Sequence, residues 1–325
     1  MATFTFRKWS WQQRKFSGTT TAFIVISVLL ILIILKFSSK RPSAIRHAQR
    51  EAQMRSTIGS ELLDRFHDYN TCIFARTVNA SPDEFWNKLS GTMDDCSKDL
   101  KLSDTSLEAF RNNDEIKYHI LPNDGTEDGG CVIITAGIGH DIRAELAIRK
   151  RLRDVQWRCD FHGADPITTK NEDLYKSIGT FYNFAVGNHT ATAWTSVKED
   201  AASVTYTEKK FPHVEMVQFF KKYINVPKII DQYLLDAEYA EYGMTHYFLE
   251  GSPLDDEEID ICQMNIEFHG EKKYAERSLF SNFMRQALRE HRWVFFKPDI
   301  DGHSRLFMLN IQSPACAERY IVDKF

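Results

Sequence analysis

The sequence predicts an α/β fold: a Rossmann-like, mostly parallel sheet with helices on both faces, an antiparallel C-terminal hairpin and one N-terminal transmembrane helix. Three observations predict it. Short apolar runs alternate with amphipathic segments from residue 131 onward, which is typical of a parallel sheet. A glycine-containing loop follows the first of these runs. An uncharged stretch at residues 16–35 lies near the N-terminus.

The uncharged stretch is long enough to cross a membrane, because twenty helical residues span roughly 30 Å. Lys15 and Lys36 close it. A cleaved signal peptide has a shorter apolar core, and a soluble helix is seldom apolar on every face. We therefore expect a tail at 1–15 and an uncleaved signal anchor in the lipid bilayer at 16–36.

The orientation of this anchor is open, since basic residues flank it on both sides and the positive-inside rule gives no clear answer. A short tail before a large C-terminal part favours a type II protein of the secretory pathway, in the Golgi or endoplasmic reticulum. Two glycosylation sequons begin at Asn79 and Asn188.

Composition narrows the class of protein. A chain that is 43% hydrophobic and 26% charged can bury an ordinary globular core. A net charge of −4 without a basic run argues against nucleic acid as a partner. None of the six cysteines forms a C-x-x-C pair, so a zinc ribbon is not expected. Their even number permits disulfides in an oxidising lumen, although Cys131 and Cys262 lead into apolar runs and are expected as small core residues.

Residues 37–128 read as a basic stem followed by a helical region. Ser81 and Glu84 have the spacing of a capping box, with Pro82 at the first helical position. This predicts a helix that ends near Cys96. A turn-rich loop at 123–130 then leads into the main domain, which we expect to span residues 129–325.

The alternation in the main domain defines its elements in order. We expect strands at 131–135, 157–161, 181–186, 229–235 and 261–268, and a polar β-like stretch at 191–197. We expect helices at 141–153, 171–177, 214–223 and 272–289. The closing hairpin pairs 293–296 with 306–311.

Two features after the first two strands indicate a ligand site. Gly137 and Gly139 permit a tight turn and a close approach of the backbone to a ligand. Asp165 follows the second strand, where a carboxylate grips a ribose diol in Rossmann-like folds. Each has a plainer explanation, as a turn glycine or an Asp-Pro turn. Together they favour a nucleotide-type cofactor, but G-x-G-x-x-G is absent.

An acidic cluster, Asp236, Glu238 and Glu241, begins where the fourth core strand ends. Such carboxylates face the ligand crevice of an open sheet and could contact the cofactor, orient an acceptor or bind a metal. Glu241 is also explained as an acid at a helix N-terminus. His269 is a third candidate base, or a strand-end histidine without a catalytic task, and Glu267 a structural partner. No metal ligand is assigned.

These motifs together resemble the FkbM-type methyltransferase domain, a branch of the class I S-adenosylmethionine-dependent enzymes. The resemblance runs from about residue 129 to the C-terminus, through the stretches 133–141, 163–166, 184–187, 234–242 and 262–269. It implies a seven-stranded sheet with a reversed last strand, S-adenosylmethionine as cofactor, and methylation of an oxygen, typically of a sugar hydroxyl.

The resemblance also implies roles for individual residues. Gly137 and Gly139, with Thr135 before them, would lie at the cofactor's methionine part, and Asp165 would hold its ribose. Asp236 and Glu238 match the family's acidic pair beside the reaction centre and are our candidate catalytic residues.

Two departures from the family pattern keep alternatives open. Thr135 stands where the family usually carries an acid, and Tyr239 stands where it usually carries glycine. A non-catalytic protein with a methyltransferase fold is one alternative. An anchored glycosyltransferase is another, because Asp299 and Asp301 form a D-x-D that could hold a metal, although a hairpin turn also favours these residues.

Overall fold

The structure, a computed structural model, describes residues 43–123, 130–197, 206–270, 274–300 and 302–325. Within these ranges, no helix has the length and apolar character that a membrane crossing requires. The tail and anchor predicted at 1–15 and 16–36 lie outside the described residues. His47–Phe325 form one compact unit, in which the helical region before residue 123 packs with the sheet that follows it.

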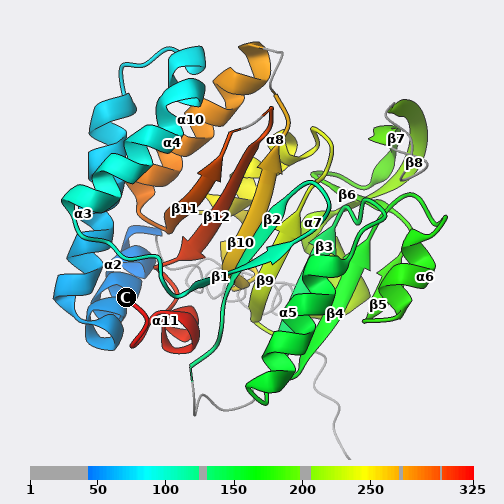
Figure 1. The fold of residues 1–325 in the computed structure, drawn as a ribbon, viewed down its shortest axis with the longest axis horizontal. Coiled ribbons are helices and arrows are strands. Elements are labelled where there is room, and N and C mark those ends of the chain that lie inside the picture. The colour runs from blue at the N-terminus through cyan, green and yellow to red at the C-terminus, as the bar shows by residue number, and fades with distance from the viewer. Residues whose placement is uncertain (1–42, 124–129, 198–205, 271–273, 301) are drawn as a thin grey trace, which may run out of the picture. The chain divides into compact units, whose positions relative to one another are not determined.

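A seven-stranded sheet forms the centre of this unit (Figure 1), with the strand order β11-β12-β10-β9-β3-β4-β5. Neighbours from β10 to β5 are parallel, whereas β12 runs antiparallel to β10 and β11. The predicted mostly parallel sheet and antiparallel C-terminal hairpin are therefore confirmed. The strands are β3 (Cys131–Ala136), β4 (Cys159–Ala164), β5 (Thr180–Tyr182), β9 (Ile229–Leu235), β10 (Asp260–Phe268), β11 (Trp293–Asp299) and β12 (Ser304–Asn310).

Both faces of the sheet are covered, and β3 shows how. All six of its residues are buried, as expected of a parallel strand between two layers. Successive side chains point to opposite faces, so Ile133 joins one hydrophobic core while Val132 and Ile134 join another. The core around Ile133 includes residues of α5 (Arg143–Asp154) and α6 (Asn171–Lys176).

The N-terminal helices pack at the β11 side of the sheet. α3 and α4 contact each other, α10 and β11, and Figure 1 shows this group beside the sheet edge. The predicted capping box is confirmed: Ser81 Oγ accepts a bond from the Glu84 amide, and the Glu84 carboxylate accepts one from the Ser81 amide. The helices are α2 (Ser43–Ile58), α3 (Ser60–Thr77), α4 (Pro82–Asp99) and α10 (Tyr274–Glu290).

A β-hairpin that the sequence did not predict lies across the sheet in Figure 1. It consists of β1 (Leu107–Arg111) and β2 (Ile116–Ile120). Its backbone is bonded by amide side chains of the sheet beneath it. Gln263 accepts from the Ile120 N–H at 2.8 Å and donates to the Ile120 carbonyl at 3.0 Å. Asn265 bonds the Tyr118 backbone in the same two ways.

A second sheet of three strands, β6-β8-β7, forms an arm beside the carboxyl end of the main sheet. The single strand predicted at 181–186 is wrong, because the chain turns after β5 and enters this arm as β6. The helix predicted at 214–223 begins two residues later, since β8 extends to Glu215. The elements are β6 (Ala185–Gly187), β7 (Ala191–Val197), β8 (Thr207–Glu215), α7 (Met216–Gln218) and the π-helix η1 (Phe219–Ile224).

All six cysteines form disulfides: Cys72–Cys96, Cys131–Cys159 and Cys262–Cys316. The expectation for Cys131 and Cys262 is thus corrected: both are buried core residues, but each is also covalently paired. Cys131 faces Cys159 as a register partner on the neighbouring strand. Cys262 pairs with the C-terminal helix α11 (Pro314–Tyr320).

Candidate functional site

The site lies where the strand order of the main sheet reverses. The chain first lays β4 and β5 to one side of β3, and later places β9 and β10 on the other side. Open α/β sheets bind ligands at this switch point, outside the carboxyl ends of the strands. The ends of β3 and β9 are held together there by a bond from the Asp236 amide to the Ala136 carbonyl, 2.9 Å long.

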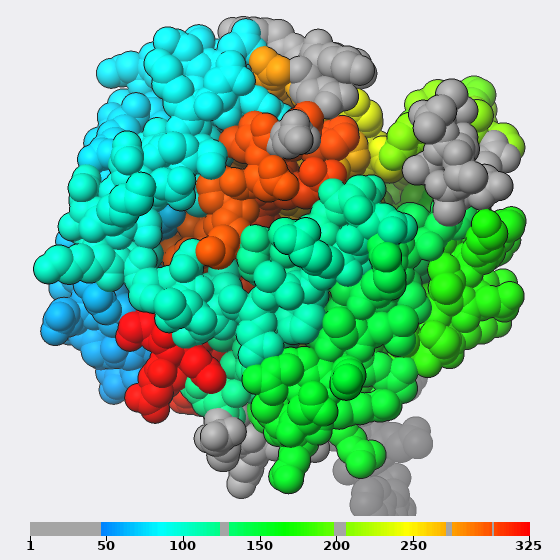
Figure 2. Space-filling model, in the orientation of Figure 1, coloured from blue at the N-terminus to red at the C-terminus, as the bar shows by residue number. Residues whose placement is uncertain are grey.

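A cavity of about 440 Å³ opens at this point. Figure 2 shows the surface hollowed beside the projecting arm. The cavity wall combines the loop after β3, the loop after β4, the acidic segment after β9 and the inner side of the arm. Its lining includes Gly137, Gly139, Asp165, Trp194, Asp236 and Glu238.

Only glycine can occupy position 137, for two reasons. Its φ is +87°, in the region that favours glycine. A Cβ at this residue would lie 1.8 Å from the Asp236 carbonyl oxygen, far inside van der Waals contact. Gly139 also has a positive φ, +62°, but a Cβ there would meet no atom within 4 Å. The loop thus needs glycine at 137 for packing and at 139 for backbone angle alone.

Asp165 is 6% exposed and holds the glycine loop. Its Oδ2 accepts from the Ile138 amide at 2.8 Å, and its Oδ1 accepts from the Ile167 amide at 2.7 Å. Burial raises the pKa of the Asp165 carboxyl, and these two backbone bonds offset part of that rise. Sequence reasoning missed this loop-fixing role. Contact with a ribose stays a prediction for the same side chain, which also lines the cavity.

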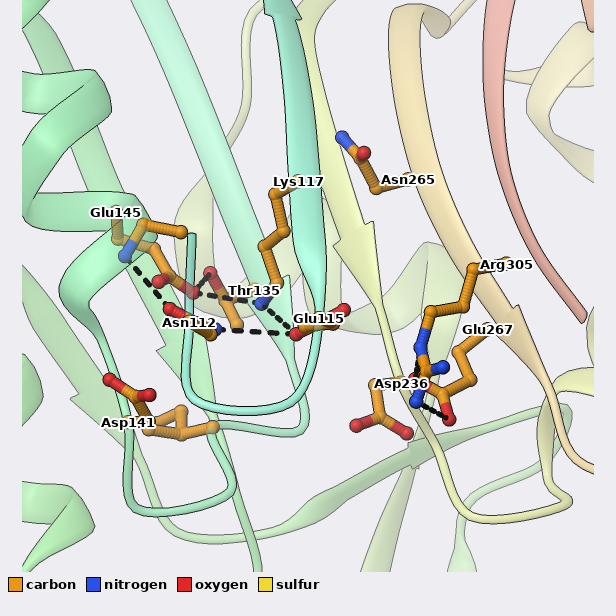
Figure 3. A network of polar contacts seen from close by, with 12 residues as sticks. Asn112, Glu115, Lys117, Thr135, Asp141, Glu145, Asp236, Asn265, Glu267 and Arg305 are labelled. Carbon is orange, nitrogen blue, oxygen red and sulfur yellow. Dashed lines mark hydrogen bonds and ion pairs between the residues drawn. The ribbon is translucent and has the colours of Figure 1, made fainter. Parts of the chain in front are cut away.

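Thr135 lies beneath the loop and is fully buried rather than in the cavity wall. Its hydroxyl accepts from the Tyr175 hydroxyl at 3.0 Å and donates to Glu145 Oε1 at 3.4 Å. Lys117 Nζ lies 3.2 Å from the same Glu145 oxygen and 3.1 Å from Glu115 (Figure 3). The buried Glu145 carboxylate therefore lies beside Thr135, the residue that replaces the acid usual in the resembled family.

The acidic segment after β9 turns sharply into the cavity. Glu238 and Tyr239 both have positive φ angles, +48° and +76°. Tyr239 thus keeps a backbone conformation that glycine adopts most easily, and its ring lies against His269, with centroids 5.2 Å apart. Strained backbone of this kind is concentrated at functional sites.

His269, at the end of β10, is the centre of a carboxylate cluster. Its Nε2 lies 3.3 Å from Glu238 Oε2 and 3.6 Å from Asp236 Oδ1. Its Nδ1 lies 3.1 Å from Oε1 of the buried Glu241. The structure brings together both predicted catalytic residues and the third candidate, and gives Glu241 a partner that the sequence did not indicate.

The electrostatics of this cluster are those of a crowded, buried site. Burial and the charge of Glu267 raise the pKa of Asp236 well above its usual value. Burial likewise raises the pKa of Glu267 to about 7, against the lowering effect of His269 and Arg305. Burial opposes charge on His269, but the bond to Glu241 and the charge of Asp236 outweigh it and raise the His269 pKa to about 10.

Sequence reasoning missed the wall that the arm contributes. Trp194 on β7 is 65% exposed and lines the cavity. Thr195 Oγ1 and His213 Nε2, on paired strands of the arm, lie 2.6 Å apart and also face it. A tryptophan within the polar stretch 191–197 was the signal available in the sequence.

No family model, no curated protein and no solved structure matches this chain.

Proposed function

We propose that this protein is an S-adenosylmethionine-dependent methyltransferase that acts on a hydroxyl acceptor. The observation that carries the proposal is the close contact between Gly137 and the Asp236 backbone at the switch point of the sheet. Because glycine has no side chain, backbone atoms line the cavity at this point. The reversed last strand β12 supports the same family resemblance.

The residues at the cavity fit the cofactor. A volume of about 440 Å³ falls in the usual range for small-molecule sites. Gly137 and Gly139 would adjoin the methionine part, and Asp165, a cavity-lining carboxylate, would accept from the ribose hydroxyls. When bound, S-adenosylmethionine would supply an electrophilic methyl group on a sulfonium.

The protein's own contribution is alignment and proton acceptance. Methyl transfer needs the acceptor oxygen in line with the methyl group, and a hydroxyl acceptor gains from a nearby base. Asp236 lies at the cavity, and burial raises the pKa of its carboxyl, which makes the carboxylate a stronger base than an exposed aspartate. Glu238, half-buried beside it, would orient the acceptor.

The D-x-D of the glycosyltransferase alternative has a different setting. Asp299 is exposed at the end of β11 and does not line the 440 Å³ cavity, and Asp301 lies outside the described residues. Nothing in the described part of the chain favours a nucleotide-sugar site over the proposed one.

We also propose that the methyltransferase domain faces an oxidising lumen, with residues 16–36 as its anchor. Disulfides are rare in reducing compartments and persist in the secretory pathway. Pairing of all six cysteines supports the lumenal orientation that the flanking charges leave open.

Calorimetric titration of the full chain, purified in detergent, tests the proposed activity. We expect S-adenosylmethionine to bind, and Asp165→Ala to lose that binding because the glycine loop loses its bond from the Ile138 amide and the cavity loses the carboxylate proposed to hold the ribose. Asp160→Ala, at an exposed residue of the preceding strand, is the matched control and should bind normally. Binding of a UDP-sugar with manganese, but not of S-adenosylmethionine, would overturn the proposal.

A further inference from the structure

We propose that Asp236, Glu238 and His269 bind a divalent transition-metal cation, of the Mn²⁺ or Zn²⁺ type, at the edge of the cavity. Binding of the cation does not depend on the proposed function, whereas a chemical role for the cation rests on that function. The argument starts from the geometry of three possible ligand atoms, Asp236 Oδ1, Glu238 Oε2 and His269 Nε2, which all lie within 4.8 Å of one another.

The separations in this group suit a coordination shell. Tetrahedral ligands bonded at about 2.1 Å lie roughly 3.4 Å apart. His269 Nε2 is 3.3 Å from the Glu238 oxygen and 3.6 Å from the Asp236 oxygen. Both distances exceed those of good N–H···O hydrogen bonds, which are about 2.7–3.2 Å.

The histidine is oriented as a metal ligand would be. Glu241 Oε1 accepts from the His269 backbone amide at 2.8 Å and lies 3.1 Å from its Nδ1. Glu241 is fully buried and cannot turn away. A carboxylate on Nδ1 fixes the ring and directs Nε2 at the metal, as in other histidine metal sites.

The carboxylates of Asp236, Glu238 and Glu241 surround His269, so their charge would stabilise a metal cation that replaces the proton on its Nε2. The neighbouring cationic side chains already have carboxylate partners: Lys117 pairs with Glu115 and Glu145, Arg305 with Glu267, and Lys297 with Asp104. Figure 3 shows Arg305 turned to Glu267, beside Asp236. Asp236 Oδ1 is buried and has no hydrogen-bond partner in the described residues, an arrangement that is costly unless a ligand satisfies it.

A second grouping, Glu267, His269 and His303, shares the same histidine. It is the weaker choice because Arg305 already binds Glu267 through both carboxylate oxygens, at 2.9 and 3.0 Å. Asp236 and Glu238 line the cavity, whereas Glu267 does not. Three protein ligands leave a coordination position free for a substrate, the pattern of catalytic sites.

The cation would change the role of Asp236. A hydroxyl oxygen that occupies the free position becomes more acidic, as metal-bound water does. Asp236 and Glu238 would then hold the cation that acidifies the acceptor, and the hydroxyl proton would pass to solvent water in the open cavity. Without the cation, Asp236 keeps the role of base.

Titration of the chelator-treated full chain with MnCl₂, followed by the electron paramagnetic resonance signal of free Mn²⁺, tests the inference. We expect one tight site, weakened at least tenfold in Asp236→Asn and in His269→Gln. Asp299→Asn removes an exposed acid of the D-x-D and should bind as the parent does. No tight site in the parent, or loss in Asp299→Asn alone, would overturn the inference.

Two further measurements separate the possible failures. Thermal unfolding identifies a variant that does not fold, and in that case the half-buried Glu238→Gln decides the question. Titration with S-adenosylmethionine in the presence of chelator is the second. Cofactor binding without manganese binding refutes only the metal site, and manganese binding without cofactor binding refutes only the methyltransferase.

Discussion

At the scale of single residues, the two loop glycines are needed for different reasons: Gly137 mainly for packing, and Gly139 for its backbone angle alone. A methyl group at residue 137 would overlap the Asp236 carbonyl, and backbone atoms of two hydrogen-bonded strand ends cannot easily move aside. At residue 139 the space is open and the cost is the positive φ alone. Alanine in this left-handed region costs about 1–2 kcal/mol.

We therefore expect Gly137→Ala to abolish S-adenosylmethionine binding and to lower the unfolding temperature sharply. Gly139→Ala should fold with a loss of about 1–2 kcal/mol and keep measurable binding. Thermal unfolding and calorimetry on both variants check this contrast. Equal effects of the two substitutions would show that the contact between Gly137 and Asp236 does not shape the site.

Residue-level reasoning from the sequence succeeded where strand order alone decides proximity. Gly137, Asp165 and Asp236 each follow a predicted strand, and parallel strands bring their carboxyl ends to one edge. It could not find Glu145, because a buried acid in the first turn of α5 has no distinctive spacing from Thr135. Nor could it foresee that Tyr239 keeps a glycine-like backbone angle.

At the scale of elements, the β1–β2 hairpin shows a second limit. Its strands are five residues long and mix polar with apolar side chains, so no periodicity identifies them. Their stabilising partners, such as Gln263, lie more than a hundred residues further on. The same polar side chains inside β10 look unfavourable for a buried strand until the hairpin is in place.

Gln263→Leu tests how much this bonding contributes. The substitution leaves the Ile120 N–H and carbonyl without their partner in a buried layer, at about 1–3 kcal/mol for each group. We expect the free energy of unfolding to fall by about 2–6 kcal/mol. Gln286→Leu, on the exposed face of α10, is the matched control and should change it by about 0.5 kcal/mol or less. A similar loss in both variants would contradict the assignment.

At the scale of the whole molecule, the disulfides and the sequons bear on the same question of compartment. The sequence supplies an even number of cysteines, but pairing depends on which strands and helices become neighbours, and that needs the fold. Cys131 meets Cys159 because β3 and β4 pair in register. Cys72 meets Cys96 because α3 packs on α4. The fold likewise distinguishes the two sequons, which look alike in the sequence.

Asn79 lies exposed in the turn between α3 and α4, where an attached glycan would extend into solvent. Asn188 is also exposed as a residue, but its amide nitrogen faces Gly243, only 2.9 Å from where a Cβ would stand. Thr190 of the same sequon bonds Gln218 and the Glu215 amide. A glycan on the Asn188 amide would collide with α8 (Glu241–Met244) beside the acidic cluster.

We therefore expect the folded protein from a secretory cell to carry one N-linked glycan, on Asn79. Digestion with an amidase specific for N-glycans should increase the gel mobility of the protein by the shift of a single glycan. Asn79→Gln should remove the shift, and Asn188→Gln, the matched control, should leave it unchanged. An unmodified Asn79 in membrane-inserted protein would contradict the lumenal orientation, because the transferase acts only in the lumen. A glycan on Asn188 in folded, cofactor-binding protein would instead contradict the packing of that asparagine against α8.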